Sequence, residues 1–179
     1  MAITKGIFSH HSNLEDRFIP DYDKLADFVD RCKGIGLKVV LTQGVYDLIH
    51  EGHARYLEKA KSLGDLLIVG VDTDELTRSR KGPTRPIVPE EERISMLVHL
   101  RHVDVVTLRH INHDIGYLIR IVKPDVMVFS KSTKDIPAKD IREYKKYCGI
   151  IKVLPPQSTT STSARIRLMN IKEKQQKGK

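Results

Sequence analysis

The stretch that decides the fold is residues 39–53, Val39-Val40-Leu41-Thr42-Gln43-Gly44-Val45-Tyr46-Asp47-Leu48-Ile49-His50-Glu51-Gly52-His53. It opens with three apolar residues, as a short buried strand does. Gly44 then lets the backbone turn where a side chain would obstruct it. Beyond His53, apolar residues return at helical spacing as far as Leu63. The stretch therefore predicts a strand, a turn and a helix in direct succession.

The two histidines of this stretch lie where the predicted helix begins. A helix start exposes N–H groups that lack partners inside the helix, and it carries the positive end of the helix dipole, so it attracts anions. Gly52 lets a phosphate approach the backbone closely, because it has no side chain. His50 and His53 add hydrogen-bond donors beside it. The pattern predicts a binding site for a phosphate group.

The whole pattern from Gly44 to His53, Gly-x-Tyr-Asp-x-x-His-x-Gly-His, resembles the signature of the cytidylyltransferase-like nucleotidyltransferases. These enzymes move a nucleoside monophosphate from a nucleoside triphosphate onto a phosphorylated acceptor. A His-x-x-His pair alone is more typical of a solvated helix start or of half a metal site. The spacing of the complete pattern favours the resemblance.

Size and composition limit the class of protein. With 179 residues, 40% of them hydrophobic, the chain suits one globular domain. It has no apolar run near the ~20 residues needed to cross a bilayer, and its start lacks the apolar stretch of a signal peptide. We therefore expect a cytoplasmic protein with no membrane partner. Cys32 and Cys148 are isolated, so we expect buried or idle thiols rather than a disulfide framework or a zinc site.

The positive charge is concentrated at one end of the chain. The formal net charge is +8, and residues 165–179 contain six cations and one anion. Because only 6% of the residues are aromatic, there is little to form a base-stacking surface. We interpret 171–179 as a solvated basic tail and expect no nucleic-acid partner. A nucleic-acid-binding protein is an alternative that rests on this tail alone.

Apolar runs of strand length alternate with segments of helical spacing along the chain. The predicted strands are 39–41, 65–71, 104–108, 125–129 and 150–154, and the predicted helices start at Asp21, Ala54, Pro89, Asn112, Pro137 and Ser158. Residues 72–88 are expected to form a long basic loop, and residues 1–20 an irregular arm.

This alternation predicts an α/β fold. We expect a Rossmann-like, doubly wound, five-stranded parallel sheet with helices on both faces and a ligand site at the carboxyl ends of the strands. The expected organisation is an N-terminal arm and helix (1–36), one nucleotidyltransferase domain (37–170) and the basic tail (171–179).

Two further segments extend the resemblance. Lys81-Gly82, followed by Thr84-Arg85-Pro86-Ile87-Val88-Pro89-Glu90-Glu91-Glu92-Arg93, is similar to the segment that brings a catalytic lysine and a nucleotide-contacting arginine in this family. Ser158-Thr159-Thr160 is similar to its C-terminal Ser-Thr-Thr signature. A triphosphate needs N–H and O–H donors along its oxygens and a cation where charge builds at the α-phosphorus, and these segments supply both.

The resemblance implies a role for each matching residue. His50 and His53 would stabilise the α-phosphate during transfer and the departing pyrophosphate, and Lys81 would bridge the acceptor phosphate and the α-phosphate. Asp47 would order the turn. The residues implied to bind the nucleotide are Gly44, Tyr46, Asp47, Gly52, Arg93, Ser158, Thr159 and Thr160. No metal ligands from the protein are implied, and Mg²⁺ is expected to accompany the triphosphate.

The resemblance leaves the substrates open. The Arg-Pro-x-x-Pro segment resembles the heptose-1-phosphate adenylyltransferases, whereas Thr73 to Glu75 with the later Glu-Glu-Arg resembles the ethanolamine-phosphate cytidylyltransferases about as well. Both groups have glycines and an acid after the fourth strand, where this chain has Phe129-Ser130-Lys131-Ser132-Thr133. We expect AMP transfer from ATP to a sugar-phosphate or polyol-phosphate acceptor, by a homodimer. The alternatives are a cytidylyltransferase that uses CTP and a small phosphorylated alcohol, and a nucleotide-binding regulator without catalysis.

Overall fold

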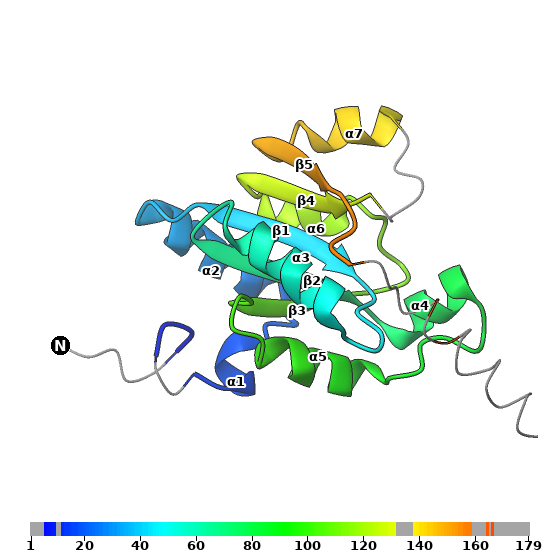
Figure 1. Ribbon diagram of the computed structural model, residues 1–179. Helices are drawn as coiled ribbons and strands as arrows, with labels where there is room; N and C mark the ends of the chain where they lie inside the picture. The colour runs from blue at the N-terminus through cyan, green and yellow to red at the C-terminus, as the bar shows by residue number, and fades with distance from the viewer. Residues whose placement is uncertain (1–5, 10–11, 132–137, 159–163, 165, 167–179) are drawn as a thin grey trace, which may run out of the picture.

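The computed structural model describes residues 6–9, 12–131, 138–158, 164 and 166, which are coloured in Figure 1. Its helices and strands alternate along most of the chain. In order they are α1 (Leu14–Arg17), α2 (Tyr22–Gly34), β1 (Val39–Gly44), α3 (Glu51–Lys61), β2 (Leu66–Asp72), α4 (Asp74–Lys81), α5 (Glu90–Val98), β3 (Val105–Arg109), α6 (Tyr117–Val122), β4 (Val126–Ser130), α7 (Ala138–Tyr144) and β5 (Ile150–Leu154).

The five strands form one parallel sheet in the order β3-β2-β1-β4-β5. The central strand β1 pairs with β2, where Leu41 lies opposite Ile68, and with β4, where Leu41 lies opposite Met127. The chain builds one side of the sheet first and then crosses to the other, so the strand order reverses between β1 and β4. In doubly wound folds this reversal marks the ligand site at the carboxyl ends of the strands. The predicted sheet is confirmed.

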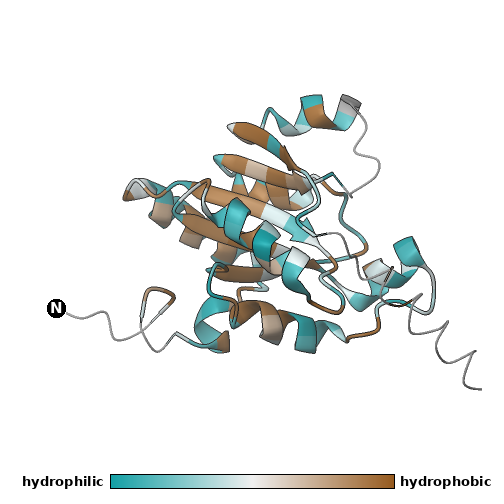
Figure 2. Ribbon diagram, in the orientation of Figure 1, coloured by the Kyte–Doolittle hydropathy of each residue, from teal (hydrophilic) through white to brown (hydrophobic). Residues whose placement is uncertain are grey.

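Helices cover both faces of the sheet, as predicted (Figure 1). One core cluster lies between the sheet and helices α2 and α6, and the other lies between the sheet and helices α3 and α5. All seven residues of β2 are buried, because a parallel strand that has helices on both sides meets no solvent. Figure 2 shows the strands as largely hydrophobic and α3 as hydrophilic where it faces outward.

The basic segment after β2 differs from the prediction. It contains a helix, α4, which Thr73 caps by accepting a hydrogen bond from the Leu76 N–H at 3.2 Å. Of its residues, only Leu76 and Thr77 are buried. A helix with so few buried positions has no apolar periodicity, so the sequence pattern did not indicate it.

Helix α6 also differs, because it begins at Tyr117 after Gly116 rather than at Asn112. The helix predicted from Ser158 and the basic tail fall almost entirely outside the described residues.

Both cysteines are buried and free, as predicted. No helix in the described part of the chain is long and apolar enough to cross a bilayer.

The segment before Asp21 is not an irregular arm throughout. Asn13 caps the short helix α1, and Phe18 forms a parallel bridge with Val106 on the outer side of β3. The guanidinium of Arg17 donates to the backbone oxygens of Val98, Val103 and Asp104. These contacts attach the segment to the edge of the sheet.

Candidate active site

The turn between β1 and α3 lies at the carboxyl end of the central strand. Tyr46 and Leu48 have φ angles of 55° and 47°, in the left-handed region that non-glycine residues seldom adopt. Gly44 is the last residue of β1, and a Cβ there would lie 3.4 Å from the Tyr46 ring. The sharp change of direction is therefore made by Tyr46 and Leu48, and not by Gly44 as predicted. Such strained backbone is common at functional sites and needs support from its surroundings.

Asp47, which lies between the two strained residues, supplies that support. The residue is 2% exposed, and its carboxylate accepts from Arg85 Nε at 2.8 Å, with Arg85 Nη2 at 2.7 Å. The backbone N–H groups of Ile87 and Val88 donate to the other carboxylate oxygen at 3.1 and 3.0 Å. Asp47 thus joins the turn to residues 85–88.

His50 caps helix α3. Its Nδ1 accepts a hydrogen bond from the Gly52 N–H at 3.0 Å. In the neutral ring the proton must then be on Nε2, where it can be donated to an anion. The capping bond therefore selects the tautomer that a phosphate site needs.

Gly52 allows three parts of the site to meet. A Cβ at this position would lie 2.7 Å from Ser158 Oγ and 2.9 Å from the His50 ring. Because real Cβ atoms do not come so close to other atoms, only glycine lets the segment after β5 approach the start of α3. The structure thus brings Ser158 to His50, whereas Thr159 and Thr160 lie outside the described residues.

His53 is held next to His50, with ring centroids 4.1 Å apart. Burial, and to a smaller extent the charges of His50 and Lys81, lower the pKa of His53 to about 4, although Asp47 acts in the opposite direction. Its buried Nδ1 has no hydrogen-bond partner among the described residues. His53 is therefore neutral at physiological pH.

Lys81 is the last residue of α4 and supplies a positive charge near His53. Its pKa is lowered, first by desolvation from the surrounding protein and then by Arg85, while Asp72 and Asp47 act in the opposite direction. The residue itself remains exposed, so the charge can meet a ligand. The structure therefore brings His50, His53 and Lys81 to one end of the sheet.

Arg93 lies in the wall of this site and is 1% exposed. It donates to the backbone oxygens of Val88, Val45 and Asp72 at 2.9, 2.6 and 2.9 Å, and to the Asp74 carboxylate at 2.6 Å. Most of its N–H groups are thus used within the protein, so its contact with a nucleotide stays a prediction.

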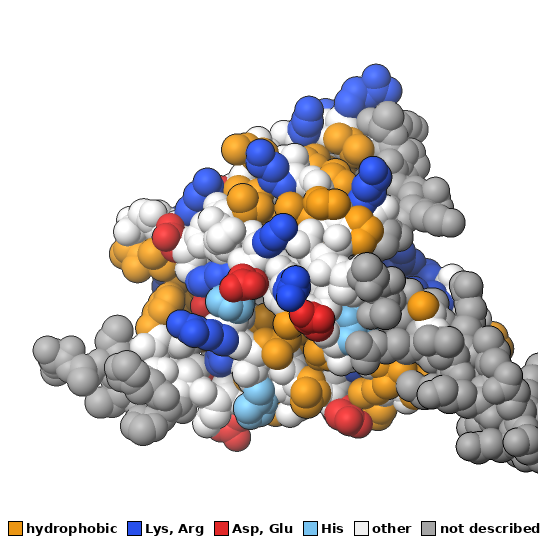
Figure 3. Space-filling model, in the orientation of Figure 1, with side chains coloured by type: hydrophobic (Ala, Val, Ile, Leu, Met, Phe, Trp, Pro, Cys, Tyr) orange, Lys and Arg blue, Asp and Glu red, His pale blue; other side chains and the backbone are white. Residues whose placement is uncertain are grey.

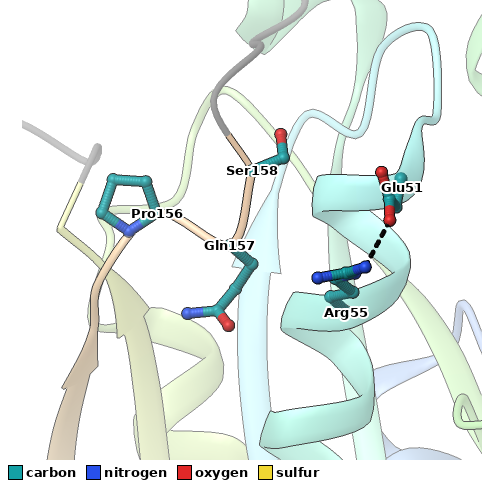
Figure 4. A pocket seen from close by; sticks show the side chains of 5 residues that line it. All are labelled: Glu51, Arg55, Pro156, Gln157 and Ser158. Atoms are coloured by element: carbon teal, nitrogen blue, oxygen red, sulfur yellow. Dashed lines mark ion pairs between the residues drawn. The ribbon is translucent and has the colours of Figure 1, made fainter.

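A pocket of about 430 Å³ opens between the start of α3 and the segment after β5. Glu51, Arg55, Pro156, Gln157 and Ser158 line it, and Arg55 pairs with Glu51 at 2.6 Å (Figure 4). On the same side of the molecule, Figure 3 shows Lys and Arg side chains over the region of α3, β5 and α7, with Asp and Glu side chains among those of α3. The lining itself holds one cation and one anion, which are paired with each other.

Sequence reasoning missed a buried charged group beside the site. Asp72 at the end of β2 is 0% exposed, and Arg109 at the end of β3 is 3% exposed. The two residues are opposite each other in the sheet register. The available signal was a charged residue at the end of each of two neighbouring apolar strands.

Comparison with known proteins agrees with this geometry. The family model described as cytidylyltransferase-like matches residues 41–175. The chain is 37% identical over 155 residues to the bifunctional protein HldE of a Nitratiruptor species, covering 85% of this chain and 32% of that protein. It is 47% identical over 91 residues to the bifunctional protein HldE of Helicobacter acinonychis (strain Sheeba), covering 51% of this chain and 19% of that protein.

Among solved structures, the chain resembles the lipopolysaccharide core biosynthesis protein from Thermoplasma volcanium GSS1. The TM-score is 0.58 at 30% identity, and the match covers 66% of this chain and 98% of the other. The curated relatives are longer, and this chain spans about a third of their length. The sheet topology, the histidine turn and these matches agree: the chain belongs to the cytidylyltransferase-like family.

Proposed function

We propose that this chain is a nucleotidyltransferase that moves AMP from ATP to a sugar phosphate and releases pyrophosphate. The observation that carries the proposal is the turn between β1 and α3, where two imidazoles lie 4.1 Å apart and the charge of Lys81 acts on His53. The relatives named bifunctional protein HldE and the relative named a lipopolysaccharide core biosynthesis protein support it. Since such cores are built from sugars, the latter name favours a sugar phosphate as the acceptor.

The proposed reaction is a displacement at the α-phosphorus. An oxygen of the acceptor phosphate forms a bond to the α-phosphorus, and the bond from this atom to the bridging oxygen of pyrophosphate breaks. His50, through Nε2–H, and His53 donate hydrogen bonds to the phosphate oxygens as their charge increases. Lys81 neutralises charge between the acceptor and the α-phosphate. Positioning and electrostatic stabilisation are the main contributions that a protein makes to such a transfer.

Mg²⁺ is proposed to arrive with ATP, where it would supply charge neutralisation along the phosphates. The two buried carboxylates near Lys81 already have arginine partners, Asp47 with Arg85 and Asp72 with Arg109. The described residues contain no group of three or more His, Cys, Asp or Glu side chains that could hold a metal ion. The phosphate oxygens would therefore be the principal ligands of the ion.

A pyrophosphate-release assay tests the function. ATP and CTP are each offered with sugar phosphates, polyol phosphates and phosphoethanolamine, with Mg²⁺ present. We expect release with ATP and a sugar phosphate, and a decrease of ~10²-fold or more in His50→Ala and His53→Ala, the usual effect of losing one transition-state donor.

The other outcomes identify the alternatives. Release only with CTP and a phosphorylated alcohol would replace the proposal by a cytidylyltransferase. ATP binding in titration calorimetry without release on any acceptor would indicate a regulator. Normal turnover in both histidine variants would contradict the catalytic role of the turn.

A further inference from the structure

The last turn of helix α4 carries Lys81 but has little that holds it in place. Its four residues, 78–81, are all exposed, and the buried residues of the helix, Leu76 and Thr77, precede them. Within the part of the chain that the structure describes, one side-chain bond joins this turn to another element. That bond runs from Arg80 Nη1 to the Asp72 carboxylate at 2.8 Å.

The start of α4 is fixed separately. Asp74 pairs with the buried Arg93 at 2.6 Å, and its N–H donates to the Glu90 carboxylate at 2.6 Å. The Thr73 N–H donates to the Arg109 backbone oxygen at 3.0 Å. These bonds hold the N-terminal end of the helix. At the C-terminal end, the Arg85 N–H donates to the Gly82 oxygen at 3.1 Å, and the bond from Arg80 to Asp72 is the side-chain contact that the last turn itself makes.

Asp72 is itself held in one orientation. Its Oδ1 accepts from Arg109 Nε at 2.8 Å and from Arg109 Nη2 at 2.5 Å. This bidentate pair is buried, and such pairs have a defined geometry. It leaves Oδ2 directed to Arg80, which approaches from α4. The carboxylate thus connects the end of β3 to the last turn of α4.

We propose that Arg80 and Asp72 are positioning residues for Lys81. Arg109 fixes the Asp72 carboxylate, and this carboxylate fixes Arg80. Arg80 in turn holds the last turn of α4, which keeps the Lys81 ammonium beside His53. The proposal rests on the proposed function of Lys81.

The charges around Lys81 explain why the position of its ammonium depends on Arg80. Lys81 interacts electrostatically with Asp72 and Asp47, and with the arginine partner of each, Arg80 and Arg85. If Arg80 lost its charge, Asp72 Oδ2 would be left without a partner, and the flexible ammonium of Lys81 would move towards it. Displacements of about 1 Å at a reacting group can cost ~10²-fold in rate.

Arg80→Gln tests this without disturbing the buried pair of Asp72 and Arg109. Arg78→Gln is the matched control, since Arg78 is exposed on the same turn and enters none of the ion pairs among the described residues. We expect Arg80→Gln to lower kcat at least ~10-fold while its Kd for ATP stays within ~3-fold. Arg80→Lys, which keeps the charge, should recover most of the loss, and Arg78→Gln should stay within ~2-fold of wild type.

A second measurement does not depend on turnover. Lysines are reductively methylated with ¹³C-formaldehyde, and the Lys81 signal is assigned by its loss in Lys81→Arg. In Arg80→Gln we expect Lys81 to titrate at clearly higher pH than in wild type, because it loses a cationic neighbour and approaches Asp72. The change in the pH at which Lys81 titrates should be smaller in Arg78→Gln.

The two measurements separate the possible failures. If the wild-type protein releases no pyrophosphate with any acceptor, the proposed function fails, and the lysine titration still decides the positioning proposal. A folded Arg80→Gln protein with wild-type kcat, or with a Lys81 titration equal to that of Arg78→Gln, would overturn the positioning role.

Discussion

His50 and His53 have the same side chain three residues apart, but their surroundings give them different chemistry. The His50 ring caps helix α3 through Nδ1, which leaves the proton of the neutral ring on Nε2, whereas His53 is held neutral by burial and by neighbouring positive charge. Lys81 supplies a positive charge that acts on His53. In the proposed site, phosphate charge would be met by hydrogen bonds from the two imidazoles and by the ammonium of Lys81.

The low pKa of His53 predicts a loss of stability in acid. Its folded pKa is about 4, below the unfolded value near 6.5, so the unfolded chain takes up the proton more readily. The contribution to stability is complete above about pH 6.5 and is lost as the pH falls through 4. Between pH 7 and pH 4.5, urea denaturation of wild type should show a loss from this group of about 2 kcal/mol, which His53→Gln should lack. Equal losses in the two proteins would show that His53 titrates normally.

Lys81→Ala separates catalysis from binding. The charge that Lys81 neutralises is greatest in the transition state, so its loss should lower kcat at least ~10²-fold. ATP binding should stay within about tenfold of wild type, a cost of ~1.4 kcal/mol or less. Single-turnover kinetics and titration calorimetry on both proteins measure these quantities. A raised KM with unchanged kcat would instead make Lys81 a residue that only holds the nucleotide.

At the scale of elements, the turn after β1 and residues 85–88 behave as one unit because Asp47 joins them. Asp47→Asn removes the ionic partner of Arg85, whose side chain is 14% exposed. Removing one partner of a buried pair typically costs ~3–5 kcal/mol, and we expect a loss of that order in urea denaturation.

Asp27→Asn is the control for this change, since the Asp27–Arg31 pair is 61% and 77% exposed. Its effect should lie within ~0.5 kcal/mol of zero. If the two substitutions cost the same, Asp47 does not hold the unit together.

The elements that depend on apolar packing could be predicted from the sequence. The five strands follow the apolar runs, and α2 was predicted from Asp21 and from the spacing of Leu25, Val29 and Cys32. Helix α4 could not be predicted in the same way, because its ends are fixed by Arg93 and Asp72, which belong to other elements. Bonds between residues distant in sequence leave no local pattern.

The candidate site shows the same division. The position of His50 at the start of α3 followed from local sequence, as did the place of Asp47 in the turn. The burial of Arg93 did not, because an arginine that follows three glutamates gives no sign that backbone carbonyls will surround it. The pairing of Asp72 with Arg109 depends on the register of β2 against β3, and this register cannot be predicted from the local sequence of either strand.

For the whole molecule, we expect the basic tail to be dispensable for chemistry. The site residues that the structure describes lie between Gly44 and Arg93 and at Ser158. A protein lacking 172–179 should therefore keep its ATP affinity and turnover within ~2-fold of wild type. The measurement is calorimetry and pyrophosphate release on the shortened chain. A folded truncation with lost affinity would place part of the site in the tail.

The homodimer and the cytoplasmic location stay predictions. Light scattering can decide whether the protein is a homodimer.

The attachment of residues 17–19 to β3 has a consequence for how the protein is made. Arg17 and its acceptor on Asp104 are 87 residues apart, and the Ile19 N–H donates to Val106 at 2.9 Å. At the usual ~5–20 residues per second, a ribosome needs roughly 4 to 17 s to add the chain between them. During that interval Phe18 has no edge to pair with, although β1 and β2 have already been synthesised. Residues 17–19 thus wait for partners that are synthesised much later, and until then they are open to chaperones and proteases.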